Sequence, residues 1–126
     1  MTLPAEHDLV IHAPARLLTV NAERTLHYRT RARIVKEWRW AAKVEAKTQK
    51  LPRFAWCDIA VSIVQQRGPL ADPGAHYPVV KAVVDGLVDA GVLLGDTGQY
   101  VRLITQSAPI KGPWNLVGLM LTGERR

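Results

Sequence analysis

Apolar residues recur at helical spacing in two stretches of the chain. In residues 24–50 they gather on one face of a helical wheel drawn at about 100° per residue. The members of this face are Ile34, Val35, Trp38, Ala41 and Ala42. A second stripe, in residues 78–90, consists of Val80, Val83, Val84, Leu87 and Val88. Pro78 suits the first turn of this second helix, where its missing N–H would have no partner anyway, and Gly91 suits the C-terminal cap. The pattern predicts two main helices.

Four other stretches have the composition of strands. They are residues 9–13, 54–65, 100–106 and 114–122. In the second of them Cys57, Ile59, Val61 and Ile63 alternate with smaller or polar residues, as a half-buried strand requires. The chain order is then β-α-β-α-β-β, which predicts an α+β fold, a small mixed β-sheet packed with two main helices. A length of 126 residues fits a single domain over residues 1–126.

Cysteine and hydropathy limit the surroundings that the sequence favours. Cys57 is the single cysteine, so no internal disulfide can form, and a reducing, cytoplasmic location is expected. Its apolar neighbours favour a buried structural thiol over a nucleophile. No apolar run approaches the ~20 residues of a membrane span, and residues 1–8 lack the basic start of a signal peptide. We therefore expect no membrane partner.

Positive charge is concentrated on the first predicted helix. The chain has a net charge of +6, and nine of its 17 basic residues lie in residues 24–50. The face opposite the apolar one carries Arg29, Arg33, Lys36, Trp40, Lys43, Lys47 and Lys50. Such a row of cations favours binding to nucleic-acid phosphates, although a solvated helix face remains the alternative. Trp40 could stack on an unpaired base or serve as a dimer or core contact.

Acidic residues surround the second helix. Lys81, Asp85 and Asp89 follow one another at four-residue spacing on one helical face, while Asp72 precedes the helix and Asp96 follows it. Aspartates from separate segments are the ligands that Mg²⁺ prefers, and Mg²⁺ assists phosphodiester hydrolysis. The alternative is an exposed helical ion pair with ordinary turn aspartates at either end.

Two stretches of this region resemble a known family motif. Residues 72–82 read DPGAHYPVVKA, and residues 85–96 read DGLVDAGVLLGD. They are similar to the core of the RusA-like crossover-junction endodeoxyribonucleases, which are common in phages and prophages. That motif runs D-x-D-N, then K-x-x-x-D-x-L, then a glycine, a hydrophobic pair and D-D. The family's mutual spacing is kept by Lys81, Asp85, Leu87, Gly91 and Asp96.

The resemblance implies an activity and a site. It implies a Mg²⁺-dependent homodimer, with Mn²⁺ as a candidate substitute and no small-molecule cofactor, that resolves Holliday junctions in DNA recombination and repair. Asp72 and Asp96 match catalytic carboxylates that hold the metal, and Lys81 matches the active-site lysine. Asp85 matches an aspartate of the same acidic patch and is included among the catalytic and metal-binding candidates.

The chain departs from the family motif at two positions. Gly74 and Gly95 each stand where an aspartate is expected, and each removes a carboxylate from the site. Asp85 could compensate, and His76 could contact DNA near the scissile phosphate, or be a solvated loop histidine. The leading hypothesis is a junction-resolving endonuclease. The alternatives are a non-catalytic DNA-binding module of the same fold and an unrelated basic RNA-binding domain.

Overall fold

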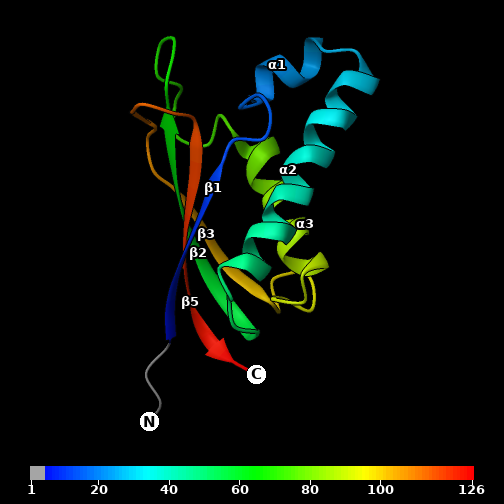
Figure 1. The fold of residues 1–126 in the computed structure, drawn as a ribbon, viewed down its shortest axis with the longest axis vertical. Coiled ribbons are helices and arrows are strands. Elements are labelled where there is room, and N and C mark those ends of the chain that lie inside the picture. The colour runs from blue at the N-terminus through cyan, green and yellow to red at the C-terminus, as the bar shows by residue number, and fades with distance from the viewer. Residues whose placement is uncertain (1–4) are drawn as a thin grey trace.

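The computed structural model describes residues 5–126 and shows an α+β domain with one five-stranded sheet and three helices. All three helices lie on one side of the sheet (Figure 1). In chain order the elements are β1 (Ala5–His12), α1 (Val20–Thr25), α2 (Tyr28–Thr48), β2 (Phe54–Gln65), α3 (Tyr77–Asp89), β3 (Val101–Gln106), β4 (Ile110–Lys111) and β5 (Leu116–Arg125). The predicted α+β class is confirmed. Among these helices none is long and apolar enough to cross a membrane.

The sheet is mixed, with β2 as its longest strand. The strand order is β1-β5-β2-β3, and the short β4 also pairs with β2. β5 runs antiparallel to both β1 and β2, whereas β3 and β4 run parallel to β2. A parallel connection needs a crossover element between the two strands, and α3 is that element between β2 and β3. The loop before α3 therefore starts at the end of β2, and the loop after α3 leads into β3.

The core lies between the sheet and the helices. Alternate residues of β2 face it, and Cys57, Ile59 and Val61 are buried as predicted. Burial raises the pKa of the Cys57 thiol to about 12, which is the behaviour of a structural thiol. Trp38 of α2 is fully buried, and its indole N–H donates to the carbonyl of Arg16 at 2.8 Å. That bond fixes the segment after β1 over α2.

The first predicted helix begins later than expected. The helix predicted over residues 24–50 is α2, which runs from Tyr28 to Thr48, and the short α1 before it was not predicted. Leu26 is extended, with φ −77° and ψ 145°, and His27 caps α2 by accepting from the N–H of Arg29 at 3.2 Å. A capping side chain of this kind satisfies donors that a new helix leaves unpaired. The remaining boundaries differ from the predicted ones by a few residues.

Candidate functional site

Lys81 joins two of the predicted site aspartates. Its Nζ lies 2.9 Å from Oδ1 of Asp85, four residues further along α3, and also forms an ion pair with Asp96. Asp96 belongs to the loop between α3 and β3, so that loop folds back along the helix. The structure thus brings Lys81, Asp85 and Asp96 together, and we call these three residues the lysine–aspartate cluster.

Charge pairing defines the electrostatics of the lysine–aspartate cluster. The hydrogen bond from Lys81 lowers the pKa of Asp96 below its ordinary value, and the opposing charge adds to this effect. In return, hydrogen bonds to Asp96 and then Asp85 raise the pKa of Lys81. At neutral pH the cluster therefore holds one cation between two carboxylates. The carboxylates of Asp85 and Asp96 are hard oxygen donors, and in this structure the ammonium group of Lys81 lies between them.

The cluster opens onto a groove between the three helices. The groove has a volume of about 330 Å³ and is lined by Val20, Glu23, Val35, Tyr77, Pro78, Lys81, Ala82 and Asp85. Glu23 comes from α1 and is the second carboxylate of the lining, in addition to Asp85. The sequence analysis did not single out Glu23 as a site residue, because its place depends on the α1–α2 break. Tyr77 is half exposed at the start of α3.

The three predicted metal ligands are not gathered into one group. Within residues 5–126, no three side chains of His, Cys, Asp or Glu come close enough together to hold a metal ion. Asp72 lies in the exposed loop before α3, where its carbonyl accepts from the N–H of Ala75 at 3.1 Å. The structure therefore assembles Asp85 with Asp96 and does not add Asp72 to them.

Local structure favours glycine at positions 74 and 95, where the RusA-like motif has aspartates. Gly74 has φ +83°, a left-handed conformation that favours glycine over residues with a Cβ. At Gly95 an added Cβ would lie 2.9 Å from Cδ2 of Tyr100, so a side chain there would require the ring to move. A carboxylate at either position would need a local change in structure.

The basic face of α2 is exposed as predicted. Arg29, Arg33, Lys36 and Lys47 are exposed, and Lys43 is half-buried. Trp40 is 63% exposed, and Nζ of Lys43 lies 5.5 Å from the centre of its ring. The core contact considered for Trp40 is therefore excluded, whereas stacking and dimer contact stay untested. A shallow depression around Trp40 is lined by Lys36, Arg39, Trp40, Lys43 and Asp89.

Arg39 connects the basic face of α2 with α3. It lines the depression around Trp40 together with Lys36 and Lys43 of that face and with Asp89 of α3. Hydrogen bonding to Asp89 raises the pKa of Arg39, and the charge of Asp85 adds a smaller effect. The guanidinium of Arg39 is thus within electrostatic reach of the cluster.

His76 is a core residue rather than a solvated loop histidine. The solvated interpretation was wrong, since His76 is 3% exposed at the N-terminal cap of α3. Its Nδ1 lies 3.3 Å from the carbonyl oxygen of Leu18, and burial lowers the pKa of the ring below its ordinary value. In this structure the ring packs under the segment after β1, so the predicted DNA contact of His76 has no exposed surface to support it.

Comparison with known proteins adds no relative. No protein-family model matches the chain, and no curated protein matches it.

Proposed function

We propose that this protein is a Mg²⁺-dependent endodeoxyribonuclease that resolves four-way DNA junctions. The observation that carries the proposal is the lysine–aspartate cluster at α3, the helix that packs against α2 and its exposed cations. Two carboxylates converge on Lys81, and a row of exposed cations runs along the adjacent helix. The first feature suits hydrolysis of a phosphodiester, and the second suits binding of duplex arms.

The residues present fit a magnesium site in which the protein supplies only two carboxylate ligands. Mg²⁺ in nucleic-acid enzymes commonly takes one or two carboxylates from the protein and completes its shell with water and substrate phosphate. Asp85 and Asp96 would supply these two carboxylates. Bound there, the metal supplies Lewis acidity toward a phosphodiester. The role of Asp72 as a third ligand stays a prediction.

Lys81 has a distinct part in this proposal. With no substrate present, its ammonium neutralises Asp85 and Asp96. When a DNA phosphate enters the groove, the flexible lysine side chain can turn to the phosphate oxygens and release both carboxylates. Before the phosphate enters, hydrogen bonds to Asp96 and Asp85 raise the pKa of Lys81, so the side chain starts this step as an ammonium. Arg39 and the cations of α2 then hold the adjoining phosphates without reading the base sequence.

Dimerisation is part of the proposal, because paired cuts across a junction need two active sites. The helices leave one face of the sheet uncovered. Exposed apolar side chains on strands of the sheet include Val10, Leu103 and Met120, which a second copy of the chain could cover. Light scattering of the purified protein measures the assembly, and a monomer at all concentrations would contradict this part of the proposal.

The decisive experiment is cleavage of labelled four-way junctions with Mg²⁺. Asp85→Asn and Asp96→Asn should abolish cutting while leaving junction affinity unchanged or higher, since each removes a negative charge near DNA. Asp72→Asn tests whether the remaining predicted ligand takes part. Asp89→Asn is the matched control, because it makes the same change in the same helix at a residue paired with Arg39. Wild-type cutting rates in both cluster variants would overturn the assigned site.

A non-catalytic DNA-binding module is the second candidate function. It is favoured by the absence of a group of three acids in residues 5–126 and by Gly74 and Gly95 in place of family aspartates. An ammonium group already satisfies the two carboxylates that remain. Junction binding without nicking at any Mg²⁺ or Mn²⁺ concentration would select this candidate over the nuclease.

A further inference from the structure

A second concave surface lies where three loops meet at one end of the sheet. The loops follow β1, follow β2 and precede β5, and Asn115 joins them. Its carbonyl accepts from the N–H of Ala13 at 3.0 Å, and its Oδ1 accepts from the N–H of Gln66 at 2.7 Å. The position of this surface is therefore set by hydrogen bonds between loops that are distant in sequence.

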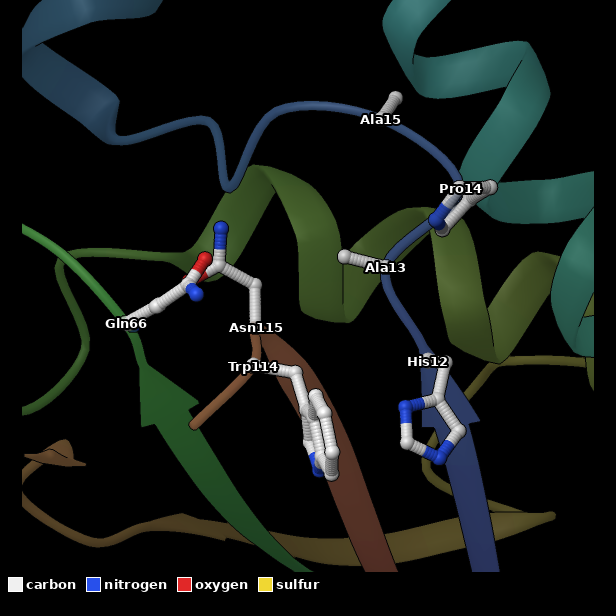
Figure 2. Close-up of a pocket in the computed structure, with 7 residues that line it drawn as sticks. All are labelled: His12, Ala13, Pro14, Ala15, Gln66, Trp114 and Asn115. Carbon is white, nitrogen blue, oxygen red and sulfur yellow. The ribbon is translucent and has the colours of Figure 1, made fainter. Parts of the chain in front are cut away.

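One half of the surface is aromatic and rich in amides. Figure 2 shows the rings of Trp114 and His12 beside one another, and the amides of Gln66 and Asn115 next to each other in the same pocket. The two ring centres are 6.4 Å apart and the rings meet edge to face. Trp114 is 57% exposed, so much of its indole is open to a flat ligand. Amide groups beside an aromatic face suit the polar edge of a nucleobase.

The other half is cationic and shares Asn115 with the first. A pocket of about 290 Å³ is lined by Arg16, Leu17, Thr19, Gln65, Arg67, Pro69, Ala71, His76 and Asn115. Arg16 and Arg67 are both exposed, and no residue lining either pocket is acidic. Two guanidinium groups with a hydroxyl and amides suit a phosphate, which guanidinium donors bind by paired hydrogen bonds.

The backbone under both arginines is fixed. Gln65 donates from Nε2 to the carbonyls of Arg67 at 3.0 Å and Pro69 at 2.8 Å, and its Oε1 accepts from the N–H of Ala71 at 3.3 Å. The carbonyl of Arg16 accepts from the buried indole of Trp38. Less conformational entropy is then lost when a ligand binds, which favours a built binding surface over a chance grouping of charges.

We propose that this surface binds one or two nucleotides of an unpaired DNA strand. A base stacks on Trp114 and meets the amides of Gln66 and Asn115, while the adjoining phosphate lies between Arg16 and Arg67. The inference rests on the proposed function in taking DNA as the ligand, although binding itself requires neither Mg²⁺ nor cleavage. It would give the protein a contact for strands that leave the paired arms at a junction, separate from the duplex contact along α2.

The test is a binding titration with a short, fluorescently labelled oligothymidylate. Fluorescence anisotropy measures the binding, and EDTA is present to remove divalent metal ions. Trp114→Ala should weaken binding roughly tenfold, within the range for loss of one stacked base, and Trp114→Phe should retain most of the affinity. The double variant Arg16→Gln, Arg67→Gln should reduce the slope of log affinity against log salt by about 0.7, the value for one phosphate contact on a single strand. Arg125→Gln, at the far end of β5, is the charge-matched control.

Three outcomes would overturn the inference. The first is wild-type oligothymidylate affinity in Trp114→Ala. The second is an effect of the double arginine variant no greater per charge than that of Arg125→Gln. The third is competition by thymidine monophosphate as strong as that by the oligonucleotide, which would make this a mononucleotide pocket. Failure of the proposed function looks different, because the wild-type protein would then bind oligothymidylate with the same dependence on Trp114 and the two arginines but would not nick a junction.

Discussion

Arg39 in α2 donates two hydrogen bonds to Asp89 in α3, from Nε at 2.6 Å and from Nη2 at 2.9 Å. The pair crosses between the two main helices and uses both oxygens of the carboxylate. It withdraws Asp89 from the lysine–aspartate cluster, although Lys81, Asp85 and Asp89 follow one another at four-residue spacing. The face of α3 is thus divided between a link to α2 and the candidate site.

Loss of this pair should have a small, pH-dependent effect on stability. Hydrogen bonding to Arg39 lowers the pKa of Asp89 in the folded state, so the pair stabilises the fold above the ordinary carboxyl pKa, and this contribution is lost as pH falls through the lowered value. Asp89→Asn should therefore reduce the free energy of unfolding at neutral pH by at most about 1 kcal/mol, because the pair is partly exposed. Urea denaturation of the wild type and the variant, at neutral and at strongly acidic pH, measures this difference in the free energy of unfolding. Asp8→Asn is the control, and an equal loss at both pH values would contradict the explanation.

Gly86 should tolerate no larger residue. A Cβ at this position would lie 2.7 Å from Cβ of Ala42 and closer still to the carbonyl oxygen of Arg39, so α2 and α3 would have to move apart. Overpacking of this kind costs about 1–3 kcal/mol, which exceeds the helix-forming advantage of alanine. We expect Gly86→Ala to lower the free energy of unfolding in urea. Gly98→Ala meets nothing within 4 Å and should have little effect; equal stability of the two variants would refute the close packing.

His76 should make stability fall in weak acid. Burial lowers its pKa in the folded state, whereas in the unfolded chain it titrates near its ordinary value of about 6.5. As pH falls below that value the unfolded state takes up a proton that the folded state does not, so stability decreases until the folded pKa is reached. His76→Gln should flatten this part of the profile, measured by urea denaturation between about pH 7.5 and pH 5. The exposed His12→Gln should keep the wild-type slope; an unchanged slope in His76→Gln would show that another group is responsible.

Lys81 should compete with a divalent cation. Its ammonium neutralises Asp85 and Asp96, so Lys81→Gln leaves two converging carboxylates without a nearby cation. We expect this variant to bind Mg²⁺ or Mn²⁺ about tenfold more tightly than the wild type, equivalent to about 1.4 kcal/mol, and to show the larger rise in Tm on metal addition. Lys111→Gln removes the same charge elsewhere and serves as the control. Equal metal-induced shifts in all three proteins would argue against a metal site at the cluster.

Much of the secondary structure was predictable because the buried faces are regular. The alternation around Cys57 gave β2 its bounds, and the valine stripe with Pro78 placed α3 to within a residue. The break between α1 and α2 was missed because the apolar face that predicts the helix begins only at Ile34 and does not mark where the helix starts. Its cause is a cap on His27 and an extended Leu26, and a sequence shows such a cap only as one candidate among many.

The site could be predicted only in part. Four-residue spacing was enough to pair Lys81 with Asp85, since a helix fixes that geometry locally. The loop between α3 and β3 brings Asp96 to Lys81. The loop before α3 keeps Asp72 apart from the other two aspartates, and neither path can be read from local spacing. His76 was misjudged because its burial depends on Leu18, which is 58 residues away in the chain.

Local spacing by itself determined the two main helices, the principal strands, the basic face of α2 and the Lys81–Asp85 pair, because helix and strand periods act over a few residues. Tertiary structure alone decided which carboxylates share Lys81, which cation pairs with Asp89 and which loops meet at Asn115. These contacts join residues far apart in the chain, and they form only when the sheet and helices pack together and fix where each loop can go.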